Sequence, residues 1–199
     1  MSTPTTALDP ARVLADPAAA PRWAAQTAAW IRDEVCAPAP ALGRPGALCP
    51  YVPAALRRHH IELVESALPG DDPEALDAQL LALAVEFRED AAARPAAEAL
   101  LRCRVVVYTA LDGRGELLTG VRTRVKPLLL ARGLTTGEFF PASPDASVRN
   151  ADVTVARSPW PALALRHSTP HDELFLAGRP ELHRVFRAAG PGIDTRAAS

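Results

Sequence analysis

Residues 102–110, RCRVVVYTA, are the stretch that decides the fold. Val105, Val106, Val107 and Tyr108 form a continuous apolar run rich in β-branched side chains, and a DGRG turn follows at 112–115. Such a run is typical of a strand that is buried on both faces. We therefore predict a central strand here, in a sheet covered by helices.

Helices and further strands are predicted on both sides of this strand. Apolar residues recur at helical spacing in four segments, which we predict to be helices: 22–35, 73–93, 115–131 and 180–189. Pro127 would kink or divide the third of them. Three weaker apolar runs are predicted to be strands: 61–64, 134–140 and 161–167.

The order of these elements predicts a two-layer α+β or α/β sandwich with a mixed sheet of four to five strands covered by helices. The segment 115–131 is long enough for a parallel crossover from the central strand, expected to be right-handed, and the last two strands are candidates for antiparallel pairing. A single domain is expected over 21–190. Flexible tails are expected at 1–20 and 191–199, because the first segment is rich in Ala, Pro, Thr and Asp without any period.

Composition limits the class of protein. With 199 residues, 48% of them hydrophobic, the chain can bury one substantial core. The 22 basic and 23 acidic residues nearly cancel, so a nucleic-acid partner is not expected. The sequence shows neither a long apolar run nor the pattern of a signal peptide, so we expect a cytoplasmic protein that binds no membrane. Three cysteines without a CxxC pair are expected to be reduced thiols.

The segment 36–53, CAPAPALGRPGALCPYVP, has too many prolines and glycines for regular structure and is predicted to be an ordered loop. Cys49, followed by a proline, is either a ligand to haem iron, a nucleophile, or a buried thiol that only packs. Arg44 either holds the loop through backbone carbonyls or binds an anionic ligand, because its guanidinium suits both.

The histidines are the next candidates. His59 and His60 are adjacent, so on a strand they would point to opposite faces and could not bind one metal. Pro170 prevents the helical turn that would align His167 with His171 as a metal pair, so no metal site is expected. His167 itself is either an axial iron ligand, a proton shuttle, or a core residue.

Charged residues of the last third complete the candidates. We expect the final strands to bring Lys126, Glu138, Arg157, Arg166 and His167 toward one region, close to the Cys49 turn. Lys126 either binds an anion or lies on a solvated helix. Glu138 is either a catalytic acid or base, or the ion-pair partner of Arg157 or Arg166, and we favour the ion pair.

Familiar catalytic motifs are absent from the sequence. It contains no GxGxxG, GxxxxGK[ST], GxSxG or HExxH pattern. Dinucleotide-binding, P-loop, α/β-hydrolase and zinc-protease functions therefore lose their usual support.

Three segments resemble domain of unknown function 6875, whose members carry similar CPF, KPxFxxxGLMxGxFHP and RSPxPLLAIRH patterns. They are LGRPGALCPYVPAAL (42–56), VKPLLLARGLTTGEFFP (125–141) and RSPWPALALRH (157–167), the last followed by PHDELFL. The resemblance covers roughly 30–186 and implies a small bacterial protein, often encoded among genes for specialised metabolites. It implies no activity. The family pattern falls on these positions: Arg44, Cys49, Pro50, Lys126, Gly133, Gly137, Arg157, Pro159, Arg166 and His167.

The chain departs from that pattern at two histidines. Phe140 stands where the family has the histidine of its FHP turn, and Ala39 stands where it commonly has PHP. A weaker similarity, confined to the cysteine turn, links the chain to haem-dependent guanidine N-hydroxylases.

Two hypotheses of function follow. The first is a tailoring enzyme of specialised metabolism, a haem-dependent oxidoreductase acting on a small anionic or amino-acid-like substrate. In it, Cys49 or His167 binds the iron beside Arg166, Glu138 moves protons, and Arg44, Lys126 and Arg157 hold the substrate. The second is a non-catalytic protein of such a pathway that binds a small molecule.

Overall fold

A four-stranded mixed sheet is the centre of the fold. The computed structural model describes residues 6–176 and 178–193. The strands are β1 (Ile61–Ser66), β2 (Cys103–Tyr108), β3 (Leu134–Phe139) and β4 (Ala162–His167), and their order in the sheet is β1-β2-β4-β3. β1 and β2 are parallel, whereas β4 is antiparallel to both of its neighbours. The predicted α+β sandwich with a mixed sheet is therefore confirmed, as is the antiparallel pairing of the last two strands.

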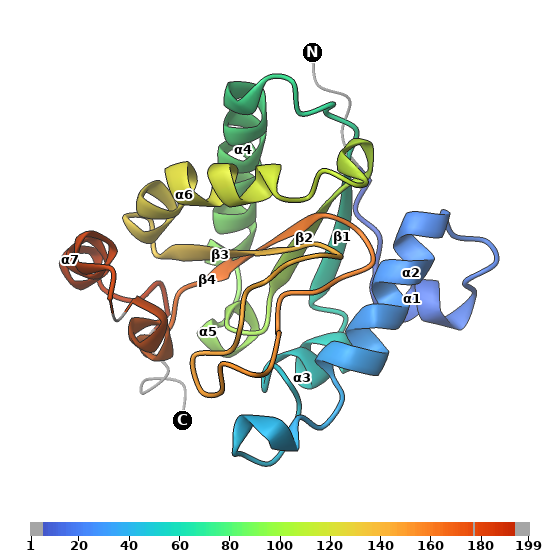
Figure 1. Ribbon diagram of the computed structural model, residues 1–199, viewed down its shortest axis with the longest axis horizontal. Helices are drawn as coiled ribbons and strands as arrows, with labels where there is room; N and C mark the ends of the chain where they lie inside the picture. The colour runs from blue at the N-terminus through green and yellow to red at the C-terminus, as the bar shows by residue number, and fades with distance from the viewer. Residues whose placement is uncertain (1–5, 177, 194–199) are drawn as a thin grey trace.

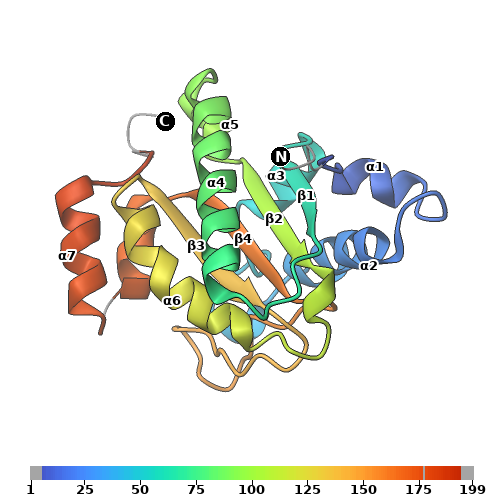
Figure 2. The same cartoon turned by 90° about the horizontal axis from the view of Figure 1, so that it is seen from above.

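Two long helices, α4 (Pro73–Ala92) and α6 (Leu117–Leu130), lie side by side on one face of the sheet, as Figure 2 shows from above. Asp72 opens α4 by accepting hydrogen bonds from the first free N–H groups of the helix. The helices bury a shared core with the sheet that includes Phe87, Val106 and Leu163. We call this the helix-covered face. Pro127 does not divide α6, which continues to Leu130.

The other face of the sheet is covered by shorter elements and by loops. Three helices pack over β1 and β2 there: α1 (Pro10–Ala15), α2 (Arg22–Trp30) and α3 (Val52–Arg57). Over the β4 and β3 half run two loops, 36–51 and 140–161, and the second crosses the sheet in Figure 1. Asn150 Nδ2 in the second loop donates to the carbonyl of Ala41 in the first (2.9 Å). We call this the loop-covered face.

Short elements complete the chain. One π-helical turn, Ile31–Val35, follows α2, and three 3-10 turns occupy Pro40–Leu42, Thr109–Leu111 and Pro170–Leu176. α5 (Ala96–Ala99) precedes β2, and α7 (Pro180–Ala189) follows the last 3-10 turn. In Figure 1, α7 lies at the opposite end of the molecule from α1 and α2. None of the helices in the described ranges is long and apolar enough to cross a membrane.

The segment expected to be a flexible N-terminal tail is ordered from residue 8 onward. Leu8 pairs with the edge strand β1 through two hydrogen bonds to Leu63, of 2.8 and 2.7 Å. Asp9 caps α1, and Val13 of that helix is buried. The prediction is wrong here because a bare strand edge offers unpaired backbone groups that a short N-terminal segment can satisfy. Residues 1–5 lie outside the described residues.

The C-terminal tail expected at 191–199 also begins with ordered contacts. Ile193 is buried, and its N–H donates to the carbonyl of Ser168 (3.1 Å). Gly133, with φ 72°, passes so close that a Cβ on it would lie 2.7 Å from the Cα of Gly192. The two glycines therefore let the chain end pack against the start of β3. Residues 194–199 lie outside the described residues.

Candidate functional site

A hollow of about 540 Å³ lies on the loop-covered side of the molecule, between the end of α2 and the loop 140–161. One wall comes from α2 and the π-helical turn, and the other from the end of the loop. Its volume falls within the range of small-molecule sites, roughly 300–1,000 Å³. The hollow is lined by Gln26, Ala29, Trp30, Asp33, Glu34, Pro141, Arg157, Ser158 and Pro159.

The π-helical turn gives the first wall its shape. The N–H of Cys36 donates to the carbonyl of Ile31 (2.9 Å), five residues back, so one extra residue enters the helix at this point. Single π turns of this kind occur frequently at functional sites. Asp33 and Glu34 lie on this widened turn and line the hollow.

The walls of the hollow are fixed by hydrogen bonds and aromatic contacts. The indole N–H of Trp160 donates to Gln26 Oε1 (2.9 Å), which ties the loop to α2. Ser158 Oγ donates to the carbonyl of Trp160 (2.6 Å). Trp30 is buried and meets Phe139 edge to face, with ring centroids 5.4 Å apart. The hollow is thus preorganised by contacts that no ligand has to supply.

The charged side chains around the hollow differ in whether they pair with another residue of the protein. Arg32 binds the carboxylate of Asp33 with both arms, at 2.6 and 2.7 Å. The side chains of Glu34 and Arg157 make no hydrogen bond or ion pair with any residue in the described ranges, and both are exposed. One carboxylate and one guanidinium without a partner in the described part of the protein therefore border the same small volume.

Arg166 lies on the loop-covered face but is occupied. Its guanidinium binds both carboxylate oxygens of Asp172, at 2.8 and 2.5 Å, and Asp172 also accepts hydrogen bonds from the backbone and hydroxyl of Thr169. Burial alone would raise the pKa of Asp172, but the hydrogen bonds and charge of Arg166 lower it overall. Arg166 therefore holds the 3-10 turn 170–176 against β4.

Cys49 packs on the apolar cluster of the same face, together with Cys36 and Cys103. Cys103 lies opposite Arg166 on the neighbouring strand, so this cluster brings Cys49 to the side of the sheet from which Arg166 projects. The expected approach of the Cys49 turn to Arg166 is therefore found in the structure. Cys49 does not line the hollow at Arg157.

His167 lies on the opposite, helix-covered face. Its ring packs against Phe87 of α4, with centroids 5.4 Å apart, and its Nε2 is buried without a partner among the described residues. Burial and the charge of Arg102 lower the pKa of His167. Because successive residues of a strand point to opposite faces, Arg166 and His167 cannot serve one site. The expectation that they converge is wrong.

Glu138 and Lys126 also belong to the helix-covered side. The sequence predicted an ion pair of Glu138 with Arg157 or Arg166. The ion pair is present, but its partner is Arg122 on α6, whose Nε lies 2.5 Å from Glu138 Oε2. Lys126 Nζ donates to the carbonyl of Thr136 on β3 (3.2 Å). Burial and the nearby arginines lower the pKa of Lys126 to about 8. Neither residue lines the hollow at Arg157.

Arg44 holds its own loop. Its guanidinium donates to the carbonyl of Leu48 (2.6 Å) and more weakly to that of Pro45 (3.4 Å). Of the three predicted substrate-binding residues, only Arg157 borders the hollow. Gln26, Asp33 and Glu34 also line the hollow but were not predicted from the sequence. Their only signal was the acidic pair that follows Trp30 at the end of a predicted helix.

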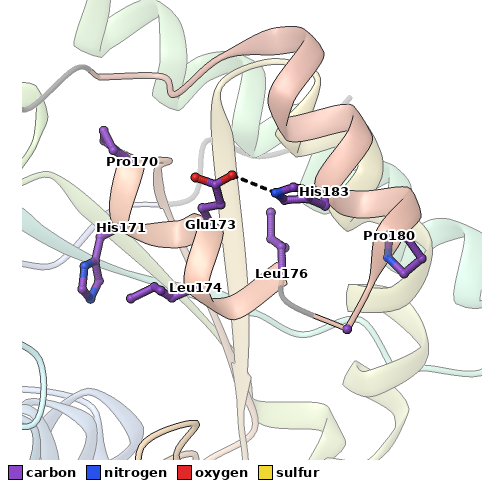
Figure 3. A pocket seen from close by; sticks show the side chains of 8 residues that line it. Pro170, His171, Glu173, Leu174, Leu176, Pro180 and His183 are labelled. Carbon is purple, nitrogen blue, oxygen red and sulfur yellow. Dashed lines mark hydrogen bonds and ion pairs between the residues drawn. The ribbon is translucent and has the colours of Figure 1, made fainter.

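A second hollow, of about 840 Å³, lies between the 3-10 turn 170–176 and α7 (Figure 3). Glu173 from the turn binds His183 of α7 (2.8 Å) and also Arg187 (2.6 Å). The rest of its lining is largely apolar, with Leu174 and Leu176 among the residues. Because its acidic group is already paired, this hollow offers a ligand fewer free charges than the one at Arg157.

Comparison with known families gives one match. A family model described as a domain of unknown function (DUF6875) covers residues 24–194. The chain belongs to this family. Neither a curated protein nor a solved structure matches it.

The DUF6875 match includes both walls of the hollow. It begins at residue 24 within α2, so the π-helical turn and the loop 140–161 both lie inside it. α1 precedes the matched range. Two positions of the family pattern, Arg157 and Pro159, line the hollow itself. The hollow is thus built from the family domain.

Proposed function

We propose that this DUF6875 protein binds a small amino-acid-like metabolite, one carrying both an ammonium and a carboxylate group, in the hollow between α2 and the loop 140–161. The observation that carries the proposal is the pair of opposite charges, Glu34 and Arg157, that have no partner among the described residues and border one preorganised hollow. A ligand with one charge of each sign would satisfy both groups. A ligand with a single charge would leave one of them unpaired.

The chemistry of each side chain supports this assignment. A guanidinium presents parallel N–H donors that match the two oxygens of a carboxylate. A glutamate carboxylate accepts hydrogen bonds from an ammonium group, and such charge-assisted bonds are stronger than neutral ones. Trp30, Pro141 and Pro159 give the hollow apolar surface, which would receive the side chain of the metabolite.

Calorimetric titration with a panel of free amino acids, and with the matching amines and carboxylic acids, tests the proposal. We expect an amino acid to bind and both analogues that lack one charge to bind more weakly. Replacing Arg157 by Met removes the donor of the carboxylate. We expect this change to weaken binding by about 1.5–3 kcal/mol, the usual range for hydrogen bonds to charged groups.

Matched variants separate binding from a general loss of charge. Arg149→Met removes an exposed arginine of the same loop that does not line the hollow, and it should leave the affinity unchanged. Glu34→Gln should weaken binding of the amino acid but not of its carboxylic-acid analogue, and Glu89→Gln on α4 is the control. Equal effects of Arg157→Met and Arg149→Met would contradict the proposal.

A haem-dependent oxidoreductase stays a prediction of the sequence. Its two alternative iron ligands, Cys49 and His167, lie on opposite faces of the sheet, so they cannot bind one iron together. The His167 ring is packed against Phe87 in the core, where no planar cofactor has room beside it. We therefore derive no chemical step through haem.

The biological setting is part of the proposal. A role in specialised metabolism and a cytoplasmic location are both expectations from the sequence. A binding protein for an amino-acid-like molecule agrees with the substrate class expected there. Binding of such a molecule requires only the charges at the hollow, whereas an oxidoreductase would also require a reactive group.

A further inference from the structure

Two of the three cysteines lie on either side of a short antiparallel pairing in the loop 36–51. The pairing joins Pro38 to Ala47, with hydrogen bonds from Ala39 N–H to Gly46 (2.9 Å) and from Leu48 N–H to Ala37 (3.1 Å). It is a single bridge. Cys36 precedes it at the end of the π-helical turn, with helical dihedral angles (φ −84°, ψ −12°), and Cys49 follows it.

A further backbone hydrogen bond brings the two cysteines together. Cys49 N–H donates to the carbonyl of Val35 (3.3 Å), the residue just before Cys36. Both cysteines pack against the same apolar cluster on the loop-covered face. They are therefore neighbours in space, as a disulfide requires, because its two Cα atoms lie about 4.4–6.8 Å apart.

The third cysteine differs from these two. All three thiols are partly exposed, and the pKa of the Cys36 thiol is raised by burial and next by the charge of Cys49. Cys103 lies on β2, and burial raises the pKa of its thiol to about 12. A thiol with so high a pKa stays protonated and reacts slowly. Cys103 is therefore a built-in comparison for the other two.

We propose that Cys36 and Cys49 form a dithiol that a peroxide oxidises to an intramolecular disulfide. One thiolate attacks the peroxide and becomes a sulfenic acid, which releases water or an alcohol from the oxidant. The second thiol then attacks that sulfur and expels water, so the S–S bond forms. The two thiols together lose two protons and two electrons, and the peroxide takes up both and is reduced to water, or to water and an alcohol.

The disulfide would join the end of the π-helical turn to the far end of the loop 36–51. Glu34, which borders the proposed ligand hollow, is two residues before Cys36. Oxidation would therefore restrict the wall of the hollow and change its affinity. This consequence rests on the proposed function, whereas the disulfide itself does not depend on any ligand.

Thiol counting on the full chain tests the proposal. The reduced protein is treated with hydrogen peroxide, unfolded, alkylated and weighed, and its disulfides are mapped after digestion. We expect two of the three thiols to be lost together, with the mass lowered by two hydrogens, and dithiothreitol to restore both. The map should join Cys36 to Cys49.

Single variants and the ligand assay separate the two proposals. Cys103→Ser should oxidise as the unmodified protein does, whereas Cys36→Ser and Cys49→Ser should gain oxygen and form no bridge. Mapping of the unmodified protein needs no variant, so poor folding of a variant leaves the test intact. Three intact thiols after treatment, a bridge to Cys103, or oxygen added without a bridge would each overturn the dithiol. A bridge that forms in a protein without amino-acid binding would overturn the proposed function alone.

Discussion

The two faces of the sheet use charged residues in opposite ways. On the helix-covered face, Glu138 and His167 are buried and Lys126 of α6 is half-buried, and each is held by neighbours from the fold. On the loop-covered side, Arg157 and Glu34 lie at a hollow with no partner in the described part of the chain. Buried charges without partners are costly, whereas charges at the surface keep their water until a ligand replaces it. The comparison assigns stability to the first face and binding to the second.

The largest effect is expected where the loop-covered face itself buries a charge pair. Asp172→Asn removes the partner of Arg166, both sides of which are mostly buried, and leaves an uncompensated guanidinium. Loss of one partner of a buried pair costs about 3–5 kcal/mol. Urea unfolding should show this loss. Asp77→Asn, which breaks an ion pair with the more exposed Arg124, should cost at most about 1 kcal/mol. Similar midpoints for the two variants would contradict this.

A buried lysine gives the next effect. In the folded protein the pKa of Lys126 is about 8, below the value of about 10.4 in an unfolded chain. The unfolded state therefore binds more protons between these values, and this group makes stability rise with pH across that window. Lys126→Met should stabilise the protein at pH 7 by about 1–3 kcal/mol and remove that rise.

The measurement for Lys126 is the difference between the stability curves of the two proteins from pH 7 to 10. A difference is needed because cysteine and tyrosine side chains of the unfolded chain also titrate in this range. Arg88→Met, at an exposed position of α4, is the control and should change neither the stability nor its pH dependence. A Lys126→Met variant that is less stable than the unmodified protein at pH 7 would show that the bond to Thr136 outweighs the cost of burial.

Acid should test the buried histidine. The pKa of His167 is lowered by burial and by Arg102, so the unfolded state takes up this proton first as the pH falls. Stability from this group is present above about pH 6.5 and is lost below it, by at most about 1.4 kcal/mol per pH unit. His167→Leu should flatten the acid side of the stability curve. His171→Leu, at an exposed position, should leave it unchanged, and identical curves for all three proteins would contradict the effect.

These residues also show what could be predicted from the sequence. α4 and α7 were predicted within one residue because their caps and apolar spacing are local features. α1 was missed because its order depends on the edge of β1, which is distant in the sequence. Alternation along β4 separates Arg166 from His167, which the expected site placed together. The same rule does not apply to His59 and His60, because both precede β1 and His59 lies in a turn with φ 58°.

The hollow itself could be predicted only in part. Arg157 was expected to bind a ligand, but its neighbours Gln26 and Glu34 come from a helix more than a hundred residues away along the chain. Sequence spacing gives no information on such a meeting. The π-helical turn adds a second obstacle. Helical periodicity predicts the directions of Asp33 and Glu34 from a regular α-helix, whereas the chain forms a wider π turn at these residues.

The smallest effect on ligand binding is expected for the hydrogen bond that joins the two walls of the hollow. Gln26→Ala removes the acceptor of the Trp160 indole, and Trp160→Phe removes the donor of the same bond. Each should weaken amino-acid binding a few-fold, because a neutral hydrogen bond contributes about 0.5–1.5 kcal/mol. In a double-mutant cycle the two changes should cost less together than the sum of each alone, since both delete one contact. Strict additivity would show that the bond does not couple α2 to the loop, and that the two walls of the hollow are held independently of each other.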